Sequence, residues 1–178
     1  TDPLNHATTY QYDSTGDLLS VTDALAHATQ MAYNASGQVA SVTDPLNHTT
    51  SFGYSGGDLV SVTDSLGRSV DFATDSVGRV ISVTDPLGNR STAAYDALDR
   101  LASRTDPLGQ TVSYGYDANG NLTSFTDARS HATAFAYDTR NRVSSKTDAL
   151  TQTETYQYDP AGALAFVTDR KGQVRGYS

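Results

Sequence analysis

Apolar and polar residues alternate at period two over short stretches of this chain, and turn-forming residues separate the stretches. Val112, Tyr114 and Tyr116, for example, alternate with Ser113 and Gly115 ahead of a turn signal. Successive side chains of a β-strand point to opposite faces, so this alternation is typical of a strand whose two faces differ. No apolar residues recur at helical spacing, and the sequence therefore predicts strands and no helix.

The alternating stretches belong to a repeat that Thr-Asp marks at positions 1, 22, 43, 63, 84, 105, 126, 147 and 168. The period is 21 residues, and the third unit is one residue short. A unit of this size can bury apolar groups only against its neighbours. We therefore expect a single repeat array over residues 1–178, made of 1–21, 22–42, 43–62, 63–83, 84–104, 105–125, 126–146, 147–167 and a partial unit 168–178.

Two turn signals divide each unit. The first occurs at Asp85–Gly88 and Asp106–Gly109. Asp stands at the first position of a type I turn, and Pro at the second position supplies the φ that the turn requires. In the second, as at Asp13–Gly16 and Asp117–Gly120, a type I turn ends on a glycine that can take positive φ. The sequence thus predicts two strands per unit, about 17 in all, and at least half of the chain in strands.

The register follows from the loop lengths. A three-residue loop between Asp13 and Asp17 predicts three facing pairs on one side of the sheet: Tyr12 with Leu18, Tyr10 with Ser20, and Thr8 with Thr22. To keep the tyrosines of the next strand on that side, the turn after Asp23 needs an even loop of four residues. Two strands of seven residues and these two loops then account for the period.

The short third unit favours hairpins. Gly56-Gly57 replaces the usual longer segment, and a two-residue Gly-Gly turn would keep Tyr54 opposite Leu59 while removing one residue. The missing residue thus lies in the turn, and the two glycines that remain suit a tighter, two-residue turn. This combination is typical of an antiparallel hairpin. A parallel β-helix is the alternative that this observation disfavours.

In this register, one face of the sheet carries two columns of large side chains, with leucine or valine between them and serine opposite the first. The first column is Tyr10, Met31, Phe52, Phe72, Ala93, Tyr114, Phe135, Tyr156 and Tyr177, and the second is Tyr12, Tyr33, Tyr54, Thr74, Tyr95, Tyr116, Tyr137 and Tyr158. The opposite face mixes Val21, Val42, Val62 and Val83 with Ala, Gln, Thr and Gly. Neither face has the dense aliphatic content of a sandwich core.

Composition narrows the partners. Acidic residues outnumber basic ones by 20 to 12, and the net charge of −8 disfavours nucleic acid or an anionic membrane as a partner. Most Asp residues lie in predicted turns, where the carboxylate can bond nearby backbone N–H groups. The chain has no cysteine, and no stretch approaches the roughly 20 apolar residues of a membrane span.

The sequence gives little support for any catalytic or metal-binding residue. His6, His27, His48 and His131 share one repeat position beside a turn, and equivalent positions on consecutive hairpins lie about 10 Å apart. Ligands of one Zn²⁺ lie about 2 Å from the metal, so a polar loop role is favoured for these histidines. Ser, Thr and Asp recur in every unit and single out no catalytic set. The sequence predicts no enzyme, no cofactor and no catalytic, cofactor-binding or metal-binding residue.

Three segments carry a resemblance to a known family: Tyr12-Asp13-Ser14-Thr15-Gly16-Asp17-Leu18, Tyr116–Leu122 and Tyr158–Leu164. Over its whole length the chain resembles the Rhs/YD-repeat family. The resemblance implies hairpins wound into a spiralling hollow shell, around a cytotoxic domain in bacterial Rhs and toxin-complex proteins, or for cell adhesion in teneurins. The chain departs from the signature at Asn34, Ser55, Thr74, Asp99 and Asn141. Tyr158-Asp159-Pro160 resembles the start of the family's self-cleaving core segment, but an ordinary repeat follows, so no cleavage residue carries over.

The expected function is a structural scaffold, a segment of a shell, tube or extracellular fibre wall that encloses or presents cargo. The alternative is a cell-surface adhesion or carbohydrate-binding module that uses exposed tyrosines and polar loops; buried tyrosines would favour the scaffold. The expected partners are further repeats, or other copies, joined through edge strands near Asp2 and Tyr177, together with an enclosed toxin domain or surface glycans. We expect a segment of a longer array that is secreted or on the cell surface, delivered by a secretion system if part of a toxin.

Overall fold

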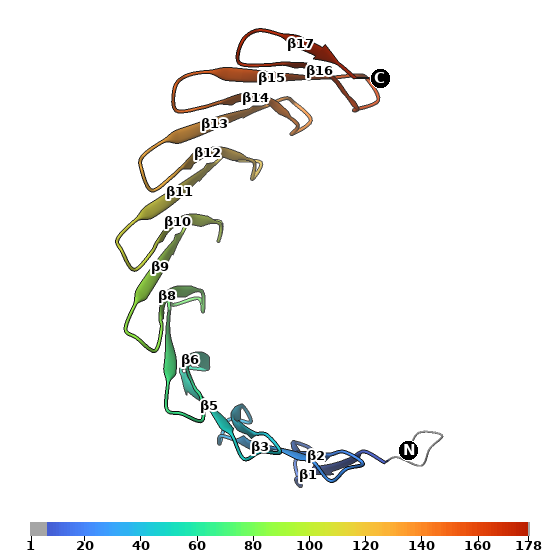
Figure 1. Ribbon diagram of the computed structural model, residues 1–178, viewed down its shortest axis with the longest axis vertical. Coiled ribbons are helices and arrows are strands. Elements are labelled where there is room, and N and C mark those ends of the chain that lie inside the picture. Colours follow the sequence, from blue (N-terminus) through green and yellow to red (C-terminus); the bar gives the residue numbers. More distant parts are fainter. Residues whose placement is uncertain (1–6, 178) are drawn as a thin grey trace. The chain divides into compact units, whose positions relative to one another are not determined.

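The computed structural model describes residues 7–177, and every regular element in that range is a β-strand (Figure 1). The chain divides into two compact units, 1–90 and 91–178. The first contains β1 (Thr9–Tyr12), β2 (Leu18–Thr22), β3 (Ala28–Tyr33), β4 (Val39–Thr43), β5 (Thr49–Ser55), β6 (Asp58–Thr63), β7 (Ser69–Thr74) and β8 (Val80–Thr84). From Arg90 onward follow β9 (Arg90–Tyr95), β10 (Leu101–Thr105), β11 (Thr111–Tyr116), β12 (Leu122–Thr126), β13 (Ala132–Tyr137), β14 (Val143–Thr147), β15 (Thr153–Tyr158), β16 (Leu164–Thr168) and β17 (Val174–Gly176).

Each strand pairs with the next one in the chain, antiparallel, from β1 to β8 in the first unit and from β9 to β17 in the second. Both units are therefore hairpin meanders, and the parallel β-helix is wrong. The predicted strand number of 17 is confirmed. A little over half of the described residues lie in strands, and none of them lies in a helix.

Both kinds of turn have the same geometry, so the predicted four-residue loop is wrong. The N–H of Asp13 donates to the carbonyl of Asp17 at 2.9 Å, and the N–H of Asp23 donates to that of His27 at 3.0 Å. Each turn thus has a three-residue loop, whose last residue takes positive φ: 97° at Gly16 and 63° at Ala26. Asp23 Oδ1 fixes its loop by accepting the N–H groups of Leu25 and His27.

In hairpins of the Asp13 kind, the second strand contains a β-bulge, that is, one extra residue. This extra residue, and not a four-residue loop, keeps the tyrosines of successive strands on one face. Tyr12 pairs with Leu18, as predicted, but beyond them Gln11 pairs with Ser20, Tyr10 with Val21 and Thr9 with Thr22. Leu19 is therefore the extra, bulged residue. The predicted pairs Tyr10 with Ser20 and Thr8 with Thr22 are wrong by one residue for this reason.

The bulge also changes which residues share a face. Val21 joins Tyr10 and Tyr12 on the aromatic face, and Val42, Val62 and Val83 likewise pair with Met31, Phe52 and Phe72. Ser20 lies on the opposite face, where its hydroxyl donates to Gln11 Oε1 at 3.1 Å. The predicted faces of the serines and valines are therefore wrong, because unbroken alternation does not hold across the bulge. The prediction that Tyr12, Tyr33, Tyr54 and Tyr95 share a face with Leu18, Val39, Leu59 and Leu101 is confirmed, because each tyrosine pairs directly with its aliphatic partner.

The shortened hairpin β5–β6 has the predicted tight turn. Ser55 pairs with Asp58 and Tyr54 with Leu59, with only Gly56 and Gly57 in the loop. Both glycines have positive φ, 61° and 99°, as a two-residue hairpin turn requires. The bulge is kept, since Gly53 pairs with Ser61, so the deletion is confined to the turn.

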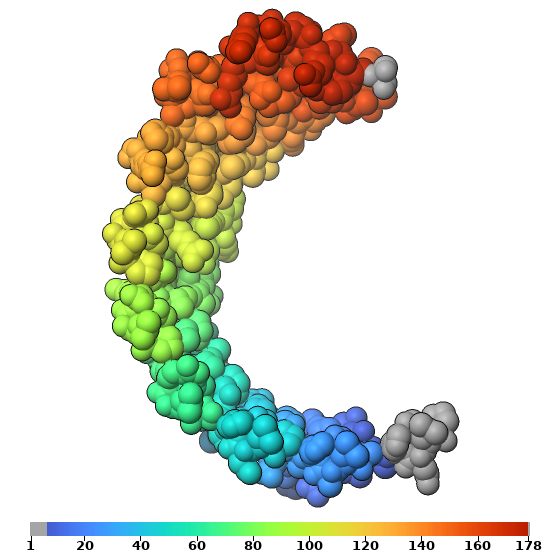
Figure 2. Space-filling view, viewed as in Figure 1, coloured from blue at the N-terminus to red at the C-terminus, as the bar shows by residue number. Residues whose placement is uncertain are grey.

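Within residues 7–177 no second layer covers the sheet of either unit. No hydrophobic residue in this range is buried, and the buried residues are two serines, Ser82 and Ser20, at 5% and 9% exposure. Along each unit, repeats contact the repeats before and after them in sequence (Figure 2). Stability therefore comes from contacts between successive hairpins, as in other repeat proteins.

Candidate functional site

The tyrosine side chains link successive hairpins. Five hydroxyls donate to a carbonyl oxygen 15 residues earlier: Tyr33 to Leu18, Tyr54 to Val39, Tyr116 to Leu101, Tyr137 to Leu122, and Tyr158 to Val143, all at 2.8–3.0 Å. Each acceptor immediately precedes a bulge residue, at the point where the bulge interrupts the regular pairing. The repeated tyrosine therefore satisfies a backbone group of its neighbouring repeat. We call this set the tyrosine ladder.

Arginines cover two rings of the tyrosine ladder. The guanidinium carbon of Arg100 lies 4.6 Å from the ring centre of Tyr116, and that of Arg142 lies 4.3 Å from that of Tyr158. Asp96 and Asp138 hold these two arginines through Nε, at 2.7 and 2.8 Å. A cation over an aromatic face is attracted to it, so a turn of one repeat is joined to a strand of the next.

The ladder tyrosines are only partly exposed. Tyr33, Tyr54, Tyr116, Tyr137 and Tyr158 are half-buried, whereas Tyr10 and Tyr12, on the first described strand, are 57% and 59% exposed. A sugar-binding aromatic needs an open ring, and a hydroxyl that binds sugar must be free to do so. The rings of the five ladder tyrosines are half-buried, and their hydroxyls are already bonded to backbone carbonyls. This arrangement favours a scaffold.

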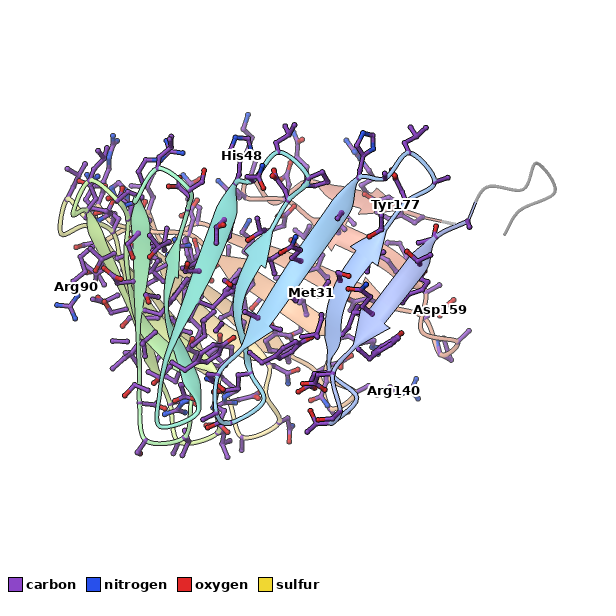
Figure 3. All side chains as sticks on the ribbon, turned by 90° about the horizontal axis from the view of Figure 1, so that it is seen from below. Met31, His48, Arg90, Arg140, Asp159 and Tyr177 are labelled. Carbon is purple, nitrogen blue, oxygen red and sulfur yellow. The ribbon has the colours of Figure 1, made fainter. Side chains whose placement is uncertain are left out.

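The histidines lie at the hairpin tips, each four residues after an Asp. Nδ1 of His27, His48 and His131 lies 2.9, 2.9 and 3.1 Å from Oδ2 of Asp23, Asp44 and Asp127. Arg68 and Asn89 make the same contact in their own turns. Figure 3 shows His48 at a turn and Met31 along a strand. His6 lies outside the described residues.

Hydrogen bonds at these tips lower the pKa of the turn aspartates. For Asp23 the backbone N–H of His27 is the largest cause, and for Asp64 it is the side chain of Arg68. These carboxylates are engaged in their own turns. Within residues 7–177 no group of three or more His, Cys, Asp or Glu could hold a metal ion.

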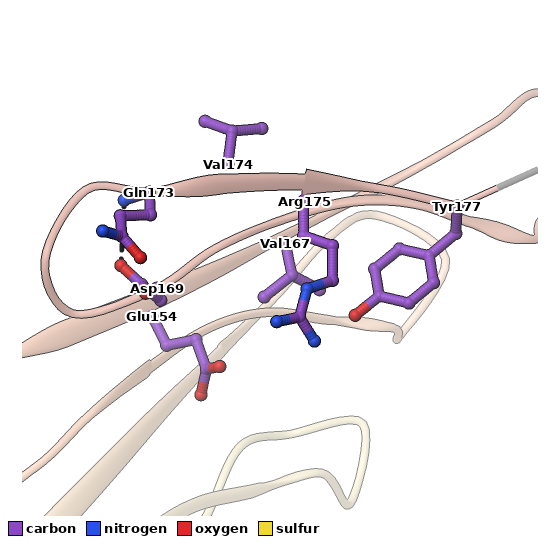
Figure 4. A pocket seen from close by; sticks show the side chains of 7 residues that line it. All are labelled: Glu154, Val167, Asp169, Gln173, Val174, Arg175 and Tyr177. Atoms are coloured by element: carbon purple, nitrogen blue, oxygen red, sulfur yellow. Dashed lines mark hydrogen bonds between the residues drawn. The ribbon is translucent and has the colours of Figure 1, made fainter.

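A shallow hollow of about 460 Å³ lies over β15, β16 and β17 (Figure 4). Its lining mixes charged and apolar side chains: Glu154, Val167, Asp169, Gln173, Val174, Arg175 and Tyr177. Two of the polar residues have partners of their own, since Glu154 accepts the hydroxyl of Tyr156 and Asp169 accepts the N–H of Gln173. Burial, and then this bond to Glu154, raise the pKa of Tyr156.

The repeat pattern and the hairpin geometry agree with a known family. The family profile named RHS Repeat matches residues 1–28, 33–69, 75–111, 95–132, 116–153 and 137–174. The chain belongs to the RHS repeat family. RHS repeats here serve as a structural scaffold, in which each hairpin is held by its neighbours.

Three solved structures are similar to most of this chain. A crystal structure of TcdB2-TccC3-TEV is 15% identical, with a TM-score of 0.47, over 91% of this chain and 12% of that one. The Photorhabdus luminescens Tc holotoxin pore is 18% identical, with a TM-score of 0.45, over 91% of this chain and 13% of that one. A porin-like protein from Bacteroides uniformis is 15% identical, with a TM-score of 0.33, over 96% and 86%. The chain thus spans about an eighth of the two toxin structures, and no curated protein matches it.

The residue four positions after the turn Asp has a role that the sequence pattern alone did not predict. That position is held by residues such as His27, Arg68, Asn89, Arg100 and Arg142, all of which bond the carboxylate. The sequence does contain a signal for this role, because the position repeatedly carries a side chain that can donate a hydrogen bond.

No helix that could cross a membrane is found among the described residues.

Proposed function

We propose that the array of residues 1–178, with the repeat boundaries given above, is a stretch of wall in a larger RHS-repeat shell or fibre that encloses or presents cargo. The tyrosine ladder carries this proposal. A hydroxyl that donates to the preceding hairpin, such as Tyr137 to Leu122, leaves little for an outside ligand and adds cohesion along the array.

The chemistry of the two faces supports a wall. One face presents aromatic and aliphatic side chains, while the other presents serine opposite Ala or Gly, as in Ser41 with Ala32 and Ser61 with Gly53. A Cβ added at Gly53 would collide with the hydroxyl of Ser61 as it is placed, so the cross-strand partner of this serine is small. A wall of this kind presents two different surfaces, one to its contents and one to its surroundings.

The proposed partners are further RHS repeats, joined by backbone hydrogen bonds at edge strands, and a cargo such as a toxin domain. The proposed location is outside the producing cell or on its surface, by way of a secretion system if a toxin is carried. The proposal assigns the chain no catalytic residue and no cofactor. Binding of surface glycans by exposed tyrosines remains the competing function.

Electron cryomicroscopy of the longest product of the gene tests the proposal. We expect residues 7–177 in a continuous sheet that surrounds other density, with the ladder hydroxyls bonded as described here. A map in which no further strands pair with the sheet of residues 7–177 would overturn the proposal.

A glycan array tests the competing function on the same protein. Binding that is abolished by Tyr10→Ala and Tyr12→Ala, but kept in Tyr137→Phe, would favour adhesion, because the first two rings are open and the third is not. A wall segment shows no such selective loss.

A further inference from the structure

Leucines are exposed along one edge of each unit, at the tips of the Asp-x-Leu turns. Their exposures are 76% for Leu25, 74% for Leu46, 75% for Leu66, 87% for Leu87, 82% for Leu108 and 76% for Leu150. The first four lie on consecutive turns of the first unit. We call these tips the leucine edge. Each leucine is the third residue of its turn and lies almost entirely in solvent.

The turn itself does not require leucine. Its third residue contributes an N–H that donates to the turn Asp, as Leu46 does to Asp44 Oδ1 at 2.8 Å. At the other ends of the strands, Thr15 and Ser36 make the same bond to Asp13 and Asn34, at 2.8 and 2.9 Å. Polar side chains therefore serve equally well in this geometry. The geometry of the turn therefore does not account for a leucine at this position in six turns.

The tips are suited to a contact that excludes water. In the turn that begins at Asp44, Pro45 has no N–H, and Leu46, Asn47 and His48 all donate theirs to Asp44. The turn that begins at Asp85 has the same arrangement, with Pro86 ahead of Leu87. Covering such a tip leaves none of these backbone N–H groups without a partner, which removes the donor part of the penalty of burying a loop.

We propose that the leucine edge docks against the leucine edge of a second copy of this chain. Neighbouring tips are two strands apart, about 10 Å. A partner can place an apolar group opposite every leucine only if it has the same spacing, and another run of these repeats has it. The contact is lateral, between turns, and is distinct from the pairing of edge strands at the ends of the array.

Charge favours opposite directions for the two copies. Residues 1–90 carry ten Asp and three Arg, a net charge of −7, whereas residues 91–178 carry nine Asp, one Glu and nine Lys or Arg, a net charge of −1. In the second unit Arg129 and Lys171 occupy the leucine position of their turns. Docking of the first unit of one copy on the second unit of the other, which we call antiparallel, brings the acidic first unit to these cations, whereas parallel docking pairs two strongly acidic first units.

Sedimentation velocity of the chain over a concentration series tests the surface. We expect a dimer whose dissociation constant rises about tenfold or more in Leu46→Gln/Leu66→Gln/Leu87→Gln, because apolar anchors carry most of such a contact. The matched control is Val77→Gln/Leu98→Gln, at the same turn position on the other edge, with exposures of 67% and 65%. The control should bind as the parent does. A monomer at all concentrations, or oligomers that resist the leucine changes, would overturn the proposal.

Cysteine cross-linking tests the orientation, since the chain has no cysteine of its own. Differently tagged Leu66→Cys and Arg129→Cys proteins are mixed and oxidised, and compared with a mixture of Leu66→Cys and Leu46→Cys. Antiparallel docking predicts more mixed disulfide dimer in the first mixture, with less of it at high salt. An excess of mixed dimer in the second mixture would contradict the antiparallel arrangement.

Discussion

The hairpins β13–β14 and β7–β8 differ at one telling position, where the first has Tyr137 and the second has Thr74. Their pairing is nevertheless the same. Tyr137 pairs with Val143 and Thr74 with Val80, and a bulge follows at the same place in both. Each turn closes with an Asp N–H donated to the carbonyl of an arginine, at 2.9 and 3.0 Å. The tyrosine is therefore not needed to form a hairpin.

What differs is the link to the preceding hairpin. The Tyr137 hydroxyl reaches the carbonyl of Leu122 at 2.8 Å, and its ring is half-buried on the sheet. Thr74 instead donates to the carboxylate of Asp58 at 2.9 Å, with no ring to bury. Turn chemistry thus sets the hairpin, and the aromatic residue sets how strongly one hairpin holds the next.

The largest expected effect is that of Tyr137→Ala. This change removes a half-buried ring and the bond to Leu122, and should lower the free energy of unfolding by about 2 kcal/mol. Urea denaturation followed by hydrogen exchange of β12 and β13 measures it. Thr74→Ala is the matched control, with an expected loss under about 1 kcal/mol. Equal losses for the two variants would show that the ring contributes nothing between repeats.

The reverse change should stabilise the protein. Thr74→Tyr adds apolar surface over the sheet and brings a hydroxyl towards the carbonyl of Leu59, the acceptor position found in other repeats. A gain of about 1 to 1.5 kcal/mol is expected, in spite of the lost bond to Asp58. The midpoint of urea unfolding reports the gain. A loss of stability would mean that Asp58 and Thr74 form a local alternative that the ladder cannot replace.

Much of this fold could be predicted from the sequence, because turns are local. Asp, Pro and Gly at fixed offsets predict the position of each turn, though not the loop length after Asp23, and Gly56-Gly57 predicts the tight turn of β5–β6. Three departures from the repeat signature, Asn34, Asp99 and Asn141, leave the turn unchanged, since Asn and Asp tolerate positive φ and bond backbone N–H groups.

The bulge could not be predicted in the same way. Leu19 and its equivalents differ in size and polarity, for example Ala40, Thr123 and Ser144, so no residue type marks the extra position. Alternation alone then gives the wrong register beyond Tyr12 and the wrong face for Ser20 and Val21. The ladder was missed for the same reason, because its acceptor carbonyls precede the bulge residues and carry no side-chain signal.

A smaller effect separates the hydroxyl from the ring. Tyr137→Phe keeps the ring and removes only the bond to Leu122, at an expected cost of roughly 0.5–1 kcal/mol. Tyr114→Phe in β11 is the matched control, because it also removes only a hydroxyl, and Tyr114 lies beside Phe125 and outside the ladder. Unfolding curves of both variants at one pH measure the difference. If Tyr137→Phe and Tyr114→Phe cost the same, the ladder bond has no net value.

The smallest effect concerns pH and compares two turns that differ in charge. Arg142, first through its side chain and then through its backbone N–H, holds the pKa of Asp138 below its usual value of 3.8. The stabilisation of this turn is therefore fully present above about pH 4, near the unfolded value, and is lost as pH falls through the lowered pKa. The equivalent turn at Asn34 bonds the N–H groups of Ser36 and Gln38 with an amide oxygen, which does not titrate in this range.

Hydrogen exchange of four amides, corrected for intrinsic rates, measures this difference. The N–H groups of Arg140 and Arg142 both donate to Asp138 Oδ1, so their protection should fall below pH 3.8, while that of Ser36 and Gln38 stays constant. Asp138→Asn should make the first pair as insensitive to acid as the second. A loss of protection centred above pH 5, or an equal loss in both turns, would place the titrating group elsewhere and assign the acid response to the sheet as a whole.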